Sequence, residues 1–183
     1  MAVNQAPSGR VGAAARLGQY RRPRARDRDR HRRTGSLLVA AQFSLIGLCL
    51  LPVGPTLGAG QLRPLGLVCL VLALVVGGLA LLAMGSDTRV HPVPHETTPL
   101  RTTGIYAWIR HPMYTAVLLA TLGVTLSGGR ALSLVAFLAL MVVLRVKSNF
   151  EDDRLNERFG WEFAVYASRV PAVIPEPWRS HGH

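Results

Sequence analysis

The chain has 183 residues, of which 49% are hydrophobic and 17% charged, and its formal net charge at pH 7 is +11. The apolar residues occur in long uncharged blocks rather than at amphipathic spacing, which excludes an ordinary water-soluble domain and predicts an all-α integral membrane protein. The two cysteines lie inside these blocks, so neither a disulfide framework nor a Cys-x-x-Cys metal site is expected.

The first segment, residues 1–35, is an arginine-rich tail with almost no bulky aliphatic residue. Low hydrophobicity and high net charge predict that it is disordered. Its arginines favour either attraction to anionic lipid headgroups or a simple role as a topology anchor. No nucleic-acid partner is expected, because no folded nucleic-acid module accompanies the tail. The apolar block that follows has the length of a full span and no obvious cleavage site, so we expect the segment to be retained.

Four apolar blocks follow, and we expect a membrane-embedded domain over residues 36–183 with about four transmembrane helices. The predicted spans are residues 36–53, 65–84, 112–127 and 131–146. The first two approach the roughly 20 residues that cross a bilayer, whereas the last two are marginal in length and could tilt or thin the bilayer locally. Because only three residues separate the last two spans, we expect them to form a tight antiparallel helical hairpin.

The basic residues indicate the orientation of these spans. Of the 21 lysines and arginines, ten precede residue 34, three lie between the second and third spans, and six follow residue 144. Only Arg63 and Arg130 remain for the opposite side. This split obeys the positive-inside rule with both termini, and the segment 147–183, in the cytoplasm. The high content of alanine, glycine and arginine is typical of a GC-rich bacterial genome, so we expect the bacterial inner membrane.

Two polar stretches flank the hairpin and should meet at the cytoplasmic surface. The first contains GIYAWIRHPMY, residues 104–114, and the second continues the last span as RVKSNFEDDRLNERFG, residues 145–160. The side chains expected to lie together are Arg110, His111, Tyr114, Lys147, Glu151 and Asp152. Polar groups at the edge of a span indicate a functional site, although a belt of interfacial anchors is the simpler alternative. We therefore expect a cofactor pocket on the cytoplasmic side.

A zinc site is a competing hypothesis, because His91 and His95 are four residues apart and Glu96 is adjacent. The ligands of a His-Glu-x-x-His site must share one helical face, and Pro92 and Pro94 prevent that helix. We expect no metal site here.

Three motifs in order, GIYAWIRHPMY, EDDRLNERFG and YASRVPAVIP, resemble the isoprenylcysteine carboxyl methyltransferase family and its wider relatives, the phospholipid methyltransferases. They cover about the last 85 residues. The resemblance implies a small membrane enzyme that uses S-adenosyl-L-methionine to methylate a lipidic or isoprenoid substrate. Membrane lipids would be its other partners.

The resemblance also implies roles for single residues. Those expected to bind the cofactor are Leu100, Tyr106, His111, Pro112, Met113, Tyr114, Glu151 and Asp152. Lys147 would orient the substrate carboxylate, and members of the family carry arginine at this position. Arg110 is the second residue expected to act in catalysis. Lysine keeps the charge but loses the bidentate fork of arginine, which leaves the substrate class open.

Carboxyl O-methylation is the favoured reaction, and an amine acceptor stays open. A carboxylate nucleophile would need no general base, whereas an amine would need one, with His111 as the candidate. Two alternatives remain. The Arg-His-Pro-x-Tyr element also resembles membrane reductases of the sterol-reductase type, which use NADPH, although Met113 stands where those favour asparagine. The second alternative is a non-enzymatic membrane adaptor that recruits anionic partners through the tail.

Overall fold

The computed structural model describes residues 25–85 and 99–173, and most of these residues are helical. The long helices are α1 (Ala25–Leu50), α2 (Arg63–Gly85), α3 (Pro112–Gly128) and α4 (Ala131–Phe159), followed by the short α5 (Trp161–Arg169). Two 3-10 turns, η2 (Ala59–Leu62) and η3 (Gly104–Ala107), precede α2 and α3 respectively. Within the described ranges no strand forms, and the isolated bridge between Thr56 and Arg130 is the single β contact. The chain divides into two units, Met1–Ser36 and Leu37–His183.

Three of the described helices are long and apolar enough to cross a membrane: Arg33–Leu50, Arg63–Met84 and Ala131–Phe159. Most of their apolar side chains lack protein cover; Leu74 and Leu82 of α2, for example, are 77% and 76% exposed. Apolar side chains exposed on this scale indicate a lipid-facing surface. The chain is therefore a membrane protein, as the sequence predicts.

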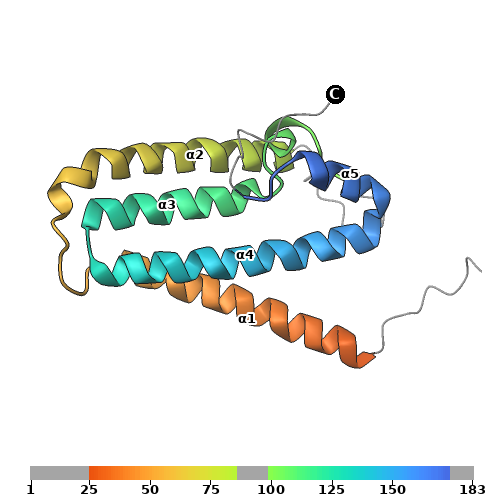
Figure 1. Cartoon of the computed structure of the whole chain (residues 1–183), viewed down its shortest axis with the longest axis horizontal. Coiled ribbons are helices and arrows are strands. Elements are labelled where there is room, and N and C mark those ends of the chain that lie inside the picture. The colour runs from red at the N-terminus through yellow and green to blue at the C-terminus, as the bar shows by residue number, and fades with distance from the viewer. Residues whose placement is uncertain (1–24, 86–98, 174–183) are drawn as a thin grey trace, which may run out of the picture. The chain divides into compact units, whose positions relative to one another are not determined.

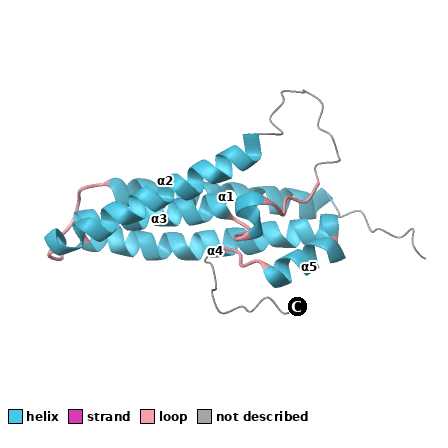
Figure 2. Cartoon of the chain, turned by 90° about the horizontal axis from the view of Figure 1, so that it is seen from above, coloured by secondary structure: helices cyan, strands magenta, loops and turns pink. Residues whose placement is uncertain are grey.

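Helix α3 is the shorter apolar helix, with 17 residues. It lies between α2 and α4 (Figures 1 and 2), and several of its residues, among them Thr115, Thr121 and Thr125, are buried. Other helices cover much of its surface, so these threonine side chains lie away from the exposed apolar surface. Whether it makes a fourth span stays a prediction.

The ends of the helices differ from the apolar blocks for local reasons. Helix α1 ends at Leu50, three residues before the predicted end, because Pro52 follows and disfavours helical geometry in the residue before it. It begins at Ala25, within the tail predicted to be disordered. Arginine and alanine are strong helix formers, so the helix extends beyond the apolar block. Residues 1–24 lie outside the described part of the chain.

Small residues set the approach of α2 to α3. A Cβ added at Gly123 would lie 2.7 Å from the Gly66 carbonyl oxygen and 2.7 Å from Leu70 Cγ, so the two helices touch backbone to backbone there. A Cβ at Gly77 would lie 3.4 Å from the Cβ of Ala116. Such contacts are typical of membrane helix pairs, where small residues let the backbones pack closely.

Gly123→Ala should therefore destabilise the protein by about 1–3 kcal/mol, the usual cost of overpacking a tight contact. Gly78→Ala is the matched control, since no atom lies within 4 Å of its added Cβ and alanine is the better helix former by about 1 kcal/mol. Thermal unfolding in detergent should show a lower midpoint for Gly123→Ala alone. A midpoint at or above that of the native protein would contradict the close crossing.

The connection between α3 and α4 consists of Gly129 and Arg130, and the two helices run antiparallel (Figure 1). Gly129 has φ 54°, a left-handed conformation that suits glycine, and its N–H donates to the Thr125 carbonyl over 2.8 Å. The α1–α2 loop braces this turn, since Leu57 N–H donates to Gly129 O over 2.6 Å. The start of α3 and the far end of α4 consequently lie at the same end of the molecule.

Helix α4 continues well past the apolar block and ends at Phe159, and the next residue, Gly160, has φ 57°. The acidic residues Glu151, Asp152 and Asp153 therefore lie within the helix, at least a full turn before its end. Acidic side chains oppose the helix dipole only near the C-terminus. Their position on α4 thus costs little stability. Two of them, Glu151 and Asp152, contact residues at the start of α3.

Candidate active site

The first wall of the site is the N-terminus of α3. Pro112 occupies the first turn, where its missing N–H and fixed φ suit the start of a helix. The segment after α5 holds the two preceding residues in place: Arg110 N–H donates to Pro171 O over 2.9 Å, and His111 N–H donates to Ala172 O over 2.8 Å. The Thr115 hydroxyl donates to the Val173 carbonyl. This extended segment, Pro171–Val173, therefore fixes the backbone that carries Arg110 and His111.

The second wall is the C-terminal half of α4. Lys147 and Glu151 lie one helical turn apart there, and so do the neighbouring Ser148 and Asp152. Ser148 is fully buried, and its hydroxyl donates to Arg145 O over 2.9 Å. The pattern places a cation and two carboxylates against the start of α3, as the sequence predicts from the short connection.

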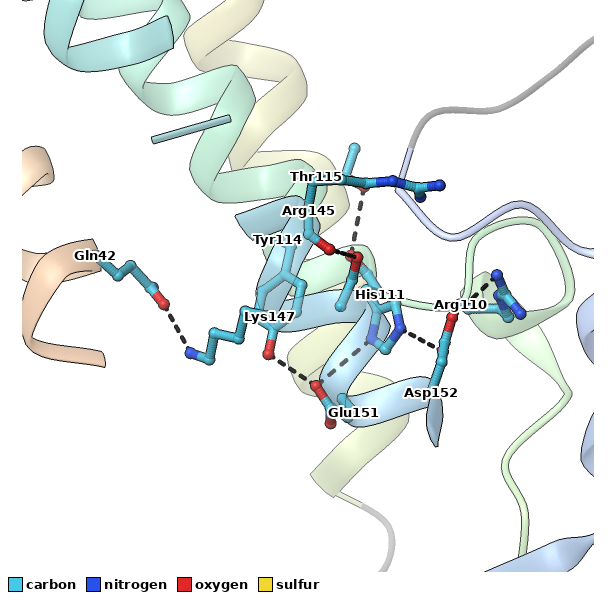
Figure 3. A network of polar contacts seen from close by, with 10 residues as sticks. Gln42, Arg110, His111, Tyr114, Thr115, Arg145, Lys147, Glu151 and Asp152 are labelled. Carbon is cyan, nitrogen blue, oxygen red and sulfur yellow. Dashed lines mark hydrogen bonds and ion pairs between the residues drawn. The ribbon is translucent and has the colours of Figure 1, made fainter. Parts of the chain in front are cut away.

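Asp152 joins the two walls (Figure 3). Its Oδ1 lies 2.8 Å from His111 Nε2, and its Oδ2 lies 3.1 Å from Arg110 Nη2. The side chains of His111 and Asp152 are 6% and 16% exposed. One carboxylate thus satisfies two donors from consecutive residues in a largely buried setting, where an unpaired charge would be costly.

Glu151 lies beside this group but is half exposed. The Tyr114 hydroxyl donates to its Oε2 over 2.7 Å, and His111 Nδ1 lies 3.7 Å from the same oxygen. The rings of His111 and Tyr114 stack, with centroids 5.3 Å apart. Glu151 keeps one oxygen, Oε1, outside these contacts, so it can accept hydrogen bonds from a ligand.

A cavity of about 210 Å³ opens next to Glu151. Five residues expected to form the site line it: Leu100, Tyr106, Arg110, His111 and Glu151. The sequence prediction missed the other six, which are Pro99, Arg101, Leu155, Arg158, Phe159 and Tyr166. Because Pro99, Glu151 and Arg158 are exposed, the cavity reaches the surface.

The helical period could have revealed part of this wall, since Leu155 and Arg158 follow Glu151 by four and seven residues on one face of α4. No helical period indicated Tyr166, although this residue begins the motif YASRVPAVIP. Its hydroxyl donates to Tyr106 O over 2.6 Å, a contact across 60 residues. Burial raises the pKa of Tyr166 to about 12, partly offset by the positive charge of Arg110, and burial also raises the pKa of Tyr106. Tyr166 therefore remains a neutral donor at physiological pH.

The remaining predicted residues do not line the cavity. Tyr114 and Asp152 contact residues that line it, and Pro112 is buried at the start of α3. Met113 is 36% exposed. Lys147 contacts the Tyr114 ring, with Nζ 5.1 Å from the ring centroid, and donates to Gln42 Oε1 over 2.7 Å. His91 and His95, considered as zinc ligands, lie outside the described residues.

A family model described as Phospholipid methyltransferase matches residues 62–162, from the end of η2 to the start of α5. The chain belongs to the phospholipid methyltransferase family. The match includes both walls of the site and most of the residues that line the cavity.

Two curated relatives of the chain are named as isoprenylcysteine methyltransferases. A probable protein-S-isoprenylcysteine O-methyltransferase of Oryza sativa subsp. indica is 33% identical over 113 residues, which cover 60% of this chain and 59% of that relative. Protein-S-isoprenylcysteine O-methyltransferase B of Arabidopsis thaliana is 30% identical over 115 residues, or 60% of this chain and 57% of the relative. The chain therefore matches less than two thirds of the length of these relatives. Their names indicate a methyltransferase and do not favour a reductase or an adaptor.

Proposed function

We propose that the protein is an S-adenosyl-L-methionine-dependent methyltransferase that O-methylates a carboxylate on a lipidic or isoprenoid substrate at the cytoplasmic face of the membrane. The position of Glu151 is the observation that carries the proposal. It lines the cavity on one side and, through Tyr114, contacts the only lysine of the chain on the other. Glu151 thus lies between a cavity that would hold the cofactor and a cation, Lys147, that would bind an acidic acceptor.

The residues around the cavity fit the chemistry of the cofactor. S-adenosyl-L-methionine carries an ammonium, a carboxylate, ribose hydroxyls and an aromatic base. Glu151 offers a carboxylate for the ammonium or the hydroxyls, and Arg101, Arg110 and Arg158 offer cations for the carboxylate. The Nε of Arg110 is buried and has no hydrogen-bond partner among the described residues, which leaves a donor for a ligand.

The size of the cavity supports binding of part of the cofactor in this conformation. Pockets for drug-sized ligands span about 300–1,000 Å³, and the volume here is about 210 Å³. Since the cavity reaches the surface, the remainder of the molecule would extend out of it along the exposed Pro99 and Arg158. Tyr106 and Phe159 offer aromatic faces for the base.

When bound, the cofactor supplies an electrophilic methyl group on a positively charged sulfur. A carboxylate acceptor has no proton to lose, so the chain would need no general base for this transfer. The protein must therefore align the reactants and exclude water. Lys147 would orient the carboxylate, and Tyr114 and Glu151 would keep the cofactor in line with it.

An amine acceptor is less well supported. It would need a general base, and His111 Nε2 already lies 2.8 Å from Asp152 Oδ1, while its Nδ1 faces Glu151. Both ring nitrogens therefore point at carboxylates of the protein rather than into open space. A carboxylate acceptor has no such requirement, which agrees with the O-methyltransferase names of the relatives.

Calorimetric titration of the detergent-solubilised protein with S-adenosyl-L-methionine tests this proposal. We expect saturable binding with a stoichiometry of one. Reduced nicotinamide dinucleotides, titrated in parallel, should produce no saturable heat. A folded protein that binds no S-adenosyl-L-methionine would refute the proposed function, and saturable binding of NADPH instead would favour the reductase alternative.

A further inference from the structure

Lys147 is the single lysine of a chain that contains 20 arginines. The composition strongly favours arginine for every other cation, so lysine at this one position calls for a physical reason. Lysine is a compact charge with three rotatable donors, whereas arginine is a planar fork. A compact ammonium suits a narrow space between helices in which donors must point in different directions.

The partner of this ammonium lies on α1, which the family match does not cover. Gln42 is 7% exposed and is the buried polar residue of α1 in the described part of the chain. Its Oε1 accepts from Lys147 Nζ over 2.7 Å (Figure 3). A buried amide in an apolar helix is costly unless it is hydrogen-bonded, and this contact supplies the bond.

The contacts continue from Gln42 to the cavity. Lys147 Nζ lies 5.1 Å from the centre of the Tyr114 ring, and the Tyr114 hydroxyl donates to Glu151, which lines the cavity. Lys147 itself does not line the cavity. The lysine is thus held on the α1 side of Tyr114 and Glu151, away from the space assigned to the cofactor.

The contact between Gln42 and Lys147 uses the amide oxygen and one of the three ammonium donors. With its carbonyl oxygen turned to Nζ, Gln42 presents its amide NH₂ group beside the ammonium, which retains two further N–H donors. An ammonium and an amide NH₂ side by side match the two oxygens of a carboxylate.

We propose that Gln42 positions Lys147 and that its amide, together with the ammonium, forms the subsite for the acceptor carboxylate. Helix α1 then belongs to the active site rather than serving only as an anchor. This inference rests on the proposed methyltransferase function, because that function supplies the carboxylate acceptor.

Two variants of Gln42 test the two parts of the inference. Gln42→Leu removes the amide at similar size, and Gln42→Glu retains an oxygen for the lysine but replaces the NH₂ group by a negative charge. Ser44→Leu is the matched control, since Ser44 is an exposed polar residue of the same helix. Thermal unfolding and the dissociation constant of S-adenosyl-L-methionine should be close to native for all three, which verifies an intact fold and cofactor site.

The position of the lysine can be followed without turnover. Because the chain has one lysine, incorporation of lysine labelled with ¹³C at Cε yields a single labelled side chain. We expect the chemical shift of Lys147 Cε to change in Gln42→Leu and to change far less in Ser44→Leu. In Gln42→Glu the chemical shift should stay different from that of free lysine. An unchanged resonance in Gln42→Leu would overturn the positioning role.

Kinetics with N-acetyl-S-farnesylcysteine as the acceptor test the amide. We expect KM for this probe to rise at least about tenfold in both Gln42 variants, the usual scale for losing a hydrogen bond to a charged group, while Ser44→Leu is unchanged. A native KM in Gln42→Glu would overturn the participation of the amide. If the native protein methylates no carboxylate probe, that result counts against the proposed function, whereas the resonance still decides whether Gln42 positions Lys147.

Discussion

Glu151→Gln is expected to lower kcat/KM for methyl transfer about 10- to 100-fold, because one hydrogen bond to a charged group contributes about 1.5–3 kcal/mol. Glutamine matches glutamate in shape, and its carbonyl can still accept from the Tyr114 hydroxyl, which donates to Glu151 over 2.7 Å. The variant therefore removes the negative charge facing the cavity and leaves the wall in place. Calorimetry should show the loss mainly as weaker binding of S-adenosyl-L-methionine.

Asp153→Asn is the control for this experiment. It makes the same change of charge two residues further along α4, at an exposed position that does not line the cavity. We expect native cofactor affinity and turnover. Equal losses in the two variants would mean that the general field of the acidic helix, rather than a contact of Glu151, is responsible, and would count against the proposed cofactor site.

Asp152→Ala is expected to have the largest effect on stability, about 3–5 kcal/mol, the usual result of removing one partner from a buried charge cluster. The Asp152 carboxylate lies 2.8 Å from His111 Nε2 and 3.1 Å from Arg110 Nη2, and the Arg110 and Asp152 side chains are 13% and 16% exposed. Without it, the Arg110 guanidinium keeps its desolvation cost but loses its counter-charge. The midpoint of thermal unfolding in detergent should fall by several degrees, and turnover should fall with it.

A double-mutant cycle tests whether the unpaired Arg110 charge causes the loss of stability in Asp152→Ala. Arg110→Met removes the stranded charge, so the double variant Arg110→Met, Asp152→Ala should be more stable than the sum of the two single effects predicts. Additive losses would mean that the two residues act independently, contrary to the contact between Nη2 and Oδ2. The same cycle with Asp153→Asn in place of Asp152→Ala should be additive.

The helices themselves could be predicted from the sequence because lipid demands long apolar blocks. The expected blocks correspond to α1, α2, α3 and α4, and the differences lie at their ends, where Pro52 ends α1 early and good helix formers extend it backward to Ala25. The small residues Gly123 and Gly77 both face a neighbouring helix, which lets the backbones of α2 and α3 approach closely. The number of spans and their orientation stay predictions, since α3 has only 17 residues.

By itself, the sequence determined that this is a helical membrane protein and, through its motifs, that it resembles a methyltransferase family. The three residues between the last two apolar blocks also predicted that the start of α3 and the end of α4 lie at the same end of the molecule, because so short a connection makes the two helices run antiparallel. Only the tertiary structure decided which distant residues complete the site. Tyr166 contacts Tyr106 across 60 residues and Gln42 contacts Lys147 across 105, and no periodicity or local spacing encodes such pairs. They follow from how α5 folds back on the loop before α3, and from how residues 37–50 of α1 pack on α4.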